Sequence, residues 1–318
     1  MITRRDFIES TAVAIVAACA RTQPAGELRT GSEPSHRGAR LPLGFSTLGC
    51  PRWQWGQVLD FADTHAYAAV ELRGLQAEMD LTKRPEFTSG QLDLTRRQIA
   101  DHGLRISCLG ASANMHEMDA PKRAAAMDEA RRFIDLASAL HAPYVRVFGN
   151  KYVEGTPRDQ LLVHIARGLR ELGDYAGERG VTVLLESHGD FTDSPTLREL
   201  MERTNSPAVA ILWDAHHTFA FGKEAPEDTA RQLGRWIRHT HLKDSVPAGS
   251  DRRYVLTGTG EVPVRRQIEV LVHMGYPGVY SFEWEKRWHP EIEEPEIAFA
   301  QFAEVASGYL REAGVRAT

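Results

Sequence analysis

The feature that most constrains the fold is a regular alternation of short apolar runs with longer amphipathic segments, beginning at Leu41. Eight of the apolar runs are typical of buried strands: 41–49, 67–73, 105–110, 143–149, 181–188, 209–216, 237–243 and 278–285. Helical patterns separate them, for example over 120–142 and 156–180, and a last amphipathic segment covers 294–314. Strands that alternate with helices pair in parallel through right-handed crossovers, and a count of eight favours closure. The sequence therefore predicts an α/β fold, with residues 41–318 forming one (β/α)8 barrel domain.

A doubly wound open sheet is the alternative arrangement of the same elements. It is disfavoured because no G-x-G-x-x-G pattern follows the first strand, where a dinucleotide-binding sheet would carry one. Gly103, Gly180 and Gly275 stand where helices should end before the next strand, which matches the preference for glycine just past a helix end.

The segment before the barrel has a different character. Residues 1–20 are typical of a Tat-type export signal, since Arg4-Arg5 precede Phe7 and Ile8 and an apolar stretch too short to span a bilayer. The order Val-Ala-Ala-Cys ending at Cys19 matches a lipobox, although a chance cysteine in an alanine-rich signal explains it equally well. Residues 21–40 lack periodicity and are predicted to be a flexible tether. We expect an exported protein, periplasmic or anchored to the membrane through a lipid at Cys19.

Charge and cysteine content indicate whether the protein binds nucleic acid and whether disulfide bonds hold its fold together. The chain has 38 basic and 43 acidic residues, a net charge of −5, and no block rich in Lys or Arg, so no nucleic-acid partner is expected. Beyond Cys19 only Cys50 and Cys108 remain, too few for a disulfide framework, and the sequence leaves open whether they pair. The oligomeric state is also left open.

Ionisable residues gather where four consecutive predicted strands end. These are Glu186, Asp214, His241 and Glu283, on the fifth to eighth strands. In a barrel of this kind the carboxyl ends of the strands meet on one face. Three carboxylates that converge there would repel one another unless a cation neutralised them. The pattern therefore predicts one divalent metal ion, with Mn²⁺ favoured by the oxygen-rich ligands, Mg²⁺ or Co²⁺ as alternatives, and Zn²⁺ not excluded.

Four motifs in the same order make the chain resemble the xylose isomerase-like TIM barrel superfamily, in its sugar phosphate isomerase/epimerase branch. They are LLESHGD (184–190), WDAHH (213–217), HTHLKD (239–244) and GYPGVYSFE (275–283). The resemblance implies that the four residues above are the metal ligands. It also implies substrate contacts at His188, His217 and Lys243 and, more loosely, at Glu71 and Arg146.

Residues around the last two strands carry further expectations. In the loop 249–263, Arg252 and Arg253 are candidates for a clamp on a substrate anion or hydroxyl, although this glycine-rich loop could equally be a mobile lid. Glu285 is expected to point away from Glu283 or to lie beyond the strand end, paired with Lys286, Arg287 or a neighbouring basic residue.

This set of residues suits proton transfer next to a carbonyl. Glu186 and Glu283 are the predicted catalytic acid and base, acting beside a metal ion that stabilises an enediolate. The expected activity is that of a sugar isomerase or epimerase on a small sugar or keto-sugar. The alternative is a lyase or dehydratase that eliminates a β-substituent from a keto-sugar or 3-keto-glycoside. An endonuclease IV-like nuclease and a non-catalytic sugar-binding barrel are further alternatives; Arg253 stands where the nuclease motif needs His.

Overall fold

The computed structural model describes residues 38–249 and 251–318. The predicted export signal 1–20, the lipobox cysteine Cys19 and most of the predicted tether 21–40 lie outside the described residues. Within the described part of the chain, no helix has the length and apolar character needed to cross a membrane. Cys50 and Cys108 are both buried and unpaired there.

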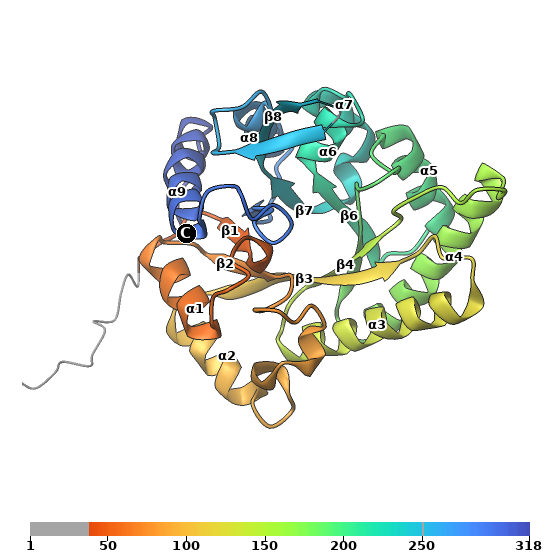
Figure 1. Cartoon of the computed structure of the whole chain (residues 1–318), viewed down its shortest axis with the longest axis horizontal. Helices are drawn as coiled ribbons and strands as arrows, with labels where there is room; N and C mark the ends of the chain where they lie inside the picture. The colour runs from red at the N-terminus through yellow and green to blue at the C-terminus, as the bar shows by residue number, and fades with distance from the viewer. Residues whose placement is uncertain (1–37, 250) are drawn as a thin grey trace, which may run out of the picture. The chain divides into compact units, whose positions relative to one another are not determined.

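Eight parallel strands close into a barrel, as the sequence predicts (Figure 1). Around the barrel their order is β1-β10-β7-β6-β5-β4-β3-β2, so strands adjacent in the chain are also neighbours in space. Their bounds are β1 Leu43–Ser46, β2 Ala69–Leu72, β3 Arg105–Asn114, β4 Tyr144–Phe148, β5 Thr182–Glu186, β6 Val209–Asp214, β7 Ile237–Leu242 and β10 Tyr280–Phe282.

The helices lie outside the strands in Figure 1. They are α1 Trp55–Thr64, α2 Leu92–Asp101, α3 Ala120–Ala139, α4 Arg158–Gly177, α5 Ser194–Thr204, α6 Ala215–Ala220, α7 Pro226–Leu233, α8 Val264–His273 and α9 Pro295–Glu312. Short 3-10 helices cover Thr47–Gly49, Leu81–Lys83, Pro85–Phe87 and Gly234–Trp236.

Local sequence explains where these helices begin. The side chain of Asp193 accepts a hydrogen bond from the backbone N–H of Thr196 and so caps α5, with a proline in its first turn. Asp119 caps α3 in the same way through the N–H of Lys122.

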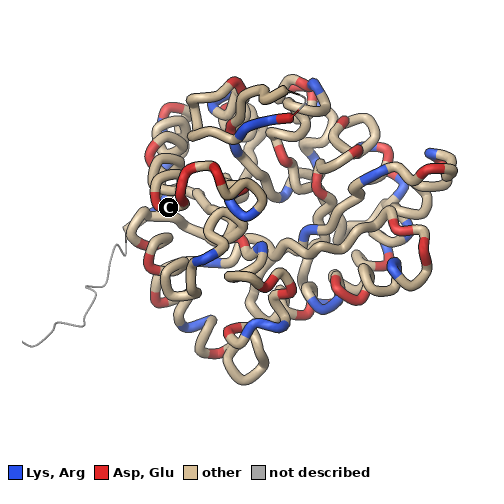
Figure 2. Tube along the Cα trace, viewed as in Figure 1, with Lys and Arg blue, Asp and Glu red and all other residues tan. Residues whose placement is uncertain are grey.

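Positions of Lys and Arg are interspersed with those of Asp and Glu along the outer helices (Figure 2).

Aromatic packing joins the last helix to the first and last strands of the barrel. The ring of Phe302 on α9 stacks on Phe282 of β10 with 4.4 Å between centroids, and Phe299 stacks on Phe45 of β1 at 4.3 Å. Because β1 and β10 are paired, these buried rings hold the two ends of the barrel domain together.

The segment after β7 contains regular structure that the sequence analysis did not predict. Two strands, β8 Asp244–Ala248 and β9 Asp251–Val255, form an antiparallel hairpin outside the barrel. The carboxylate of Asp244 accepts hydrogen bonds from the backbone N–H groups of Gly258, Gly260 and Val262, at 2.8, 2.9 and 3.1 Å. A buried side chain therefore organises the backbone that follows the hairpin, within the segment 249–263 for which the sequence offers an anion clamp or a mobile lid.

Candidate active site

The structure brings the four predicted ligands together at the carboxyl ends of the strands. Glu186 and Asp214 are the last residues of β5 and β6, His241 lies near the end of β7, and Glu283 follows β10 directly. Strand register aligns them, since His241 pairs with Asp214 on one side and with Ser281 of β10 on the other. One ligand atom from each of the four lies within 4.8 Å of the others, and all four side chains are buried.

The Nδ1 atom of His241 lies among the three carboxylates. It is 3.2 Å from Glu283 Oε2, 3.4 Å from Glu186 Oε1 and 3.9 Å from Asp214 Oδ2, and it has no hydrogen bond among the described residues. Burial alone would lower the pKa of His241, but Glu283 and Glu71 hold it well above its usual range. A buried nitrogen without a hydrogen bond, facing three carboxylates that favour positive charge, is a donor set that fits a divalent cation.

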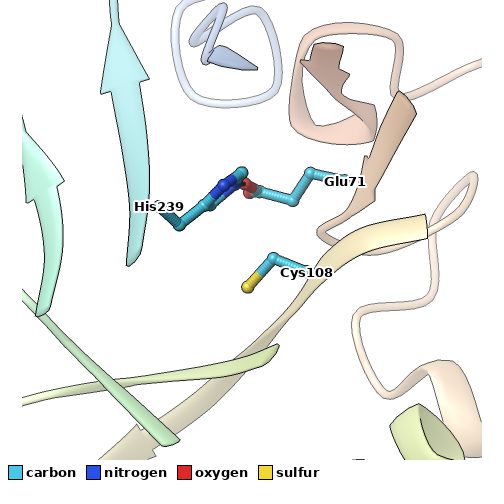
Figure 3. Close-up of side chains that lie close together, drawn as sticks. All are labelled: Glu71, Cys108 and His239. Atoms are coloured by element: carbon cyan, nitrogen blue, oxygen red, sulfur yellow. Dashed lines mark hydrogen bonds and ion pairs between the residues drawn. The ribbon is translucent and has the colours of Figure 1, made fainter. Parts of the chain in front are cut away.

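A carboxylate on the far side of the ring fixes how His241 is turned. Glu71 Oε2 accepts hydrogen bonds from Nε2 of His239 at 2.7 Å and from Nε2 of His241 at 2.8 Å. Figure 3 shows the Glu71 carboxylate meeting the ring of His239, with the sulfur of Cys108 nearby. Because a carboxylate only accepts, both Nε2 atoms carry hydrogen, which leaves Nδ1 of His241 free for a metal. The structure thus places Glu71 against His241, the predicted ligand histidine, while its expected contact with substrate stays a prediction.

Two other groups of ligand atoms lie equally close. In Glu71, Cys108 and His239, the first and last are already hydrogen-bonded to each other, and burial raises the pKa of the Cys108 thiol. In Asp214, His216 and His217, Nε2 of His216 lies 2.7 Å from Ser245 Oγ and Nδ1 of His217 lies 3.1 Å from the Ser187 carbonyl. The group of Glu186, Asp214, His241 and Glu283 differs from both in bringing three carboxylates to one imidazole nitrogen that has no hydrogen bond among the described residues.

Lys243 neutralises the same cluster from the other side. Its fully buried Nζ donates to Asp214 Oδ2 at 2.6 Å, to Glu285 Oε1 at 3.0 Å and to Glu283 Oε2. Burial disfavours its charge, but the carboxylates, Asp214 first, raise the pKa of Lys243 well above its usual range. The residue predicted to bind substrate therefore holds three carboxylates in place.

Sequence reasoning missed that Glu285 belongs to this cluster. It lies beyond the end of β10, as expected, yet it shares Lys243 with Glu283 and pairs with neither of the two basic residues expected for it. Lys286 instead pairs with Glu294, and Arg287 donates to backbone carbonyls. The spacing of two residues between Glu283 and Glu285 was the available signal, because alternate residues of an extended chain share a face.

Arg146 on β4 supports Glu186. Its Nε lies 2.9 Å from Glu186 Oε2 and its Nη1 donates to the Ala111 carbonyl at 2.9 Å, within a buried environment. Burial would raise the pKa of Glu186, but Arg146 lowers it below its usual range and keeps the carboxylate ionised. As with Glu71 and Lys243, the structure places Arg146 against a predicted metal ligand, and its contact with substrate stays a prediction.

Two histidines remain where a substrate could meet them. The rings of His188 and His217 face each other edge to face with 5.0 Å between centroids, and His217 Nδ1 lies 3.4 Å from Asp214 Oδ2. Burial lowers the pKa of both, so each ring is neutral at pH 7 and offers a donor and an acceptor.

The hairpin places Tyr254, and not Arg253, toward the carboxylate cluster around Lys243. Tyr254 is buried, its ring 5.4 Å from that of His216 and 6.0 Å from Lys243 Nζ, whereas Arg253 is exposed. Arg252 donates to Ser245 and Glu261. Arg252 thus stabilises the hairpin itself, and the alternation of faces along β9 leaves Arg253 exposed; a clamp on the substrate by these two residues stays a prediction.

Comparison with known proteins places these observations in a family. The model of the family described as xylose isomerase-like TIM barrel matches residues 59–304. Among curated proteins, an inosose dehydratase of Geobacillus thermodenitrificans is 28% identical over 165 residues, 46% of this chain and 52% of that protein. A fructoselysine 3-epimerase of Shigella flexneri is 25% identical over 179 residues, 55% of this chain and 64% of that protein. The chain thus spans about half to two thirds of the length of these two relatives.

Solved structures show the same fold. The crystal structure of IOLI protein with a bound zinc atom has a TM-score of 0.71 at 20% identity, covering 85% of this chain and 99% of that one. A structure of L-ribulose 3-epimerase has a TM-score of 0.68 at 17% identity, covering 85% and 95%. At these identities the likeness concerns the fold alone.

Proposed function

The chain belongs to the xylose isomerase-like TIM barrel family, and we propose that it is a divalent-metal-dependent enzyme that moves a proton next to the carbonyl of a small sugar. The observation that carries the proposal is the convergence of Glu186, Asp214, His241 and Glu283 around one point at the strand ends. These four residues would hold the ion. When bound, it would polarise a carbonyl and the adjacent hydroxyl and so stabilise enediolate character.

The proton transfers fall to Glu186 and Glu283. They lie on strands three positions apart around the barrel, so their carboxylates approach a carbonyl compound from different sides. Arg146 keeps the Glu186 carboxylate ionised, while His241 first and Lys243 second keep that of Glu283 ionised, so both are available as proton acceptors. One carboxylate removes the proton. The other returns it to the opposite face of the same carbon for epimerisation, or to the neighbouring carbon for isomerisation.

The remaining residues of the site orient the substrate and exclude water. His188 and His217, both neutral, are suited to bind sugar hydroxyls as donor and acceptor. Trp213 and Trp284 are fully buried and belong to the packing around the site, not to its lining. We propose Mn²⁺ as the ion, while the bound zinc in the IOLI structure supports Zn²⁺ as the alternative.

Elimination is the second candidate reaction. The curated relatives include an inosose dehydratase and a 3-dehydroshikimate dehydratase of Pseudomonas putida, the latter 25% identical over 228 residues that cover 69% of this chain and 35% of that protein. Dehydration begins with the same removal of a proton beside a carbonyl, and it differs only in losing a β-substituent afterwards. A dehydratase or lyase acting on a keto-sugar or 3-keto-glycoside therefore needs the same carboxylates.

The test is a metal analysis of the folded protein, followed by a solvent-deuterium exchange screen over ketoses and 3-keto-glycosides. The proposal predicts one divalent ion per chain and metal-dependent deuterium incorporation beside the carbonyl of at least one substrate. The product spectrum then separates epimerisation from elimination. A protein that binds the ion but exchanges no proton on any of these compounds would be a sugar-binding barrel without catalysis.

A further inference from the structure

Arg73 is a buried cation without an ion-pair partner in the part of the chain that the structure describes. It follows Leu72, the last residue of β2, and its side chain is only 7% exposed. Its one hydrogen bond is long, from Nη1 to the Gly110 carbonyl at 3.4 Å. Among residues 38–249 and 251–318, no carboxylate lies within salt-bridge distance of its guanidinium, whereas Arg146 nearby has Glu186 at 2.9 Å.

The backbone of β3 makes room for both arginines. Gly110 is paired in register with Arg146 and follows Leu109, the partner of Leu72. A Cβ on Gly110 would lie 2.6 Å from Arg73 Cδ and 2.8 Å from Arg146 Nη2, closer than side-chain atoms normally approach. Glycine at this position therefore allows two guanidinium side chains to lie against the strand.

This arrangement is unfavourable unless something else compensates it. Burial first, and the like charge of Arg146 second, lower the pKa of Arg73 to about 9. The charges that favour its protonated form are Glu186, Glu283 and Glu129, so Arg73 lies within the field of the metal-binding carboxylates. A buried, unpaired charge normally carries a large free-energy cost, and persistent examples occur at binding sites.

We propose that Arg73 binds an anionic oxyacid group of the substrate, a carboxylate or a phosphate. This inference rests on the proposed function, because it assumes a sugar held at the strand ends beside Glu186 and Glu283. The planar guanidinium offers parallel N–H donors that match two oxygens of such a group. The preferred substrate would then be an acidic sugar and not a neutral one.

The test is calorimetric binding of three probes to the metal-loaded full chain: glucuronate, glucose 6-phosphate and glucose. The wild-type protein should bind one acidic probe more tightly than glucose, and which one it prefers separates carboxylate from phosphate. Arg73→Met should weaken the preferred acidic probe roughly 10- to 100-fold and leave glucose nearly unchanged. Arg73→Lys should lie between, and Arg97→Met, an exposed change on the outer helix α2, should match the wild type.

Thermal unfolding of the same variants separates a binding role from a structural one. Removing a buried, unpaired cation should leave the melting temperature of Arg73→Met unchanged or raised. A lowered melting temperature, an equal loss for all three probes, or a wild-type protein without preference for an acidic probe would overturn the inference. The binding of the three probes is measured without turnover. A failure to exchange protons would therefore count against the proposed function, while the affinities would still show whether Arg73 binds an anion.

Discussion

The orientation of one imidazole, that of His241, decides whether this site can hold a metal. Glu71 sets it by accepting the Nε2–H of His241 while also accepting that of His239. Histidine ligands in metal sites commonly have such a carboxylate behind them, and its loss typically weakens metal affinity 10- to 100-fold.

Glu71→Gln should therefore reduce the affinity for Mn²⁺ by about that factor, because the amide offers one acceptor and presents N–H groups to rings that need an acceptor. Metal titration gives the affinity, and nitrogen NMR of the metal-free protein reports the tautomer of His241. The matched control is Cys108→Ser, which alters a buried neighbour of Glu71. Equal losses in both variants would indicate that the ion binds beside Cys108 and that Glu71 is itself a ligand.

At this scale the sequence predicts which residues gather but not what each one contacts. Spacing on consecutive strands is enough to bring Glu186, Asp214 and Glu283 together, because their backbone positions determine it. The contacts of Lys243 and Arg146 depend on side-chain direction and on which carboxylate lies nearest once the barrel closes. The residues that determine these contacts lie on strands far apart in the chain, and a local motif does not include them. The motifs therefore led only to the prediction that both residues contact the substrate.

At the scale of elements, the hairpin β8–β9 depends on one carboxylate. Asp244 is buried and accepts from four backbone N–H groups: those of Ser245 at 2.8 Å, Gly258, Gly260 and Val262. Asp244→Asn keeps the size but replaces one acceptor oxygen by a donor that faces N–H groups. We expect it to destabilise the protein by about 1–3 kcal/mol.

Hydrogen exchange should show where that loss acts. The amides of 256–262 should exchange faster in Asp244→Asn, while those of the barrel strands keep their protection. Gly260→Ala should have a similar effect, since its Cβ would lie 2.2 Å from Asp244 Oδ1. Arg253→Gln, an exposed change on β9 of the hairpin, is the control. Unchanged protection over 256–262 in both variants would show that the hairpin holds this segment without Asp244.

The eight barrel strands follow from the sequence because each is a short buried run flanked by turn residues, and a local pattern is enough to find it. The hairpin and the segment after it could not be predicted in this way, because Asp244 accepts hydrogen bonds from N–H groups 14 to 18 residues further along the chain. Strand ends also differ: the first strand stops at Ser46, whose side chain caps a 3-10 helix, while β3 continues to Asn114. The residues at which these strands end depend on side-chain hydrogen bonds, which the periodic pattern of apolar residues does not reveal.

At the scale of the whole molecule, the proposed location of the enzyme rests on residues before the barrel. We propose export through the Tat pathway because of Arg4 and Arg5. Changing both to lysine should abolish translocation of a fused reporter, and fractionation of the cells measures it. The same substitutions should leave metal binding by the purified protein intact. Export that persists in the double variant would remove the Tat proposal, and lipid labelling that persists in Cys19→Ala would remove the lipid anchor.

The barrel as a whole explains why the ligand set could be found without a structure. Closure sends the carboxyl ends of all eight strands to one face, so residues 97 positions apart, Glu186 and Glu283, converge there. The central claim is that these two carboxylates, while holding the metal, also transfer the proton.

Solvent-deuterium exchange by metal-loaded Glu186→Gln and Glu283→Gln tests this claim most directly. Glutamine keeps one oxygen for the ion but removes the base, so exchange into a substrate that the wild type turns over should fall roughly 10²- to 10⁴-fold. Metal content should fall less, and the exposed Glu291→Gln should behave as the wild type. Near wild-type exchange by both metal-loaded variants would contradict the claim, since the carboxylates would then only hold the ion and another residue would have to remove the proton.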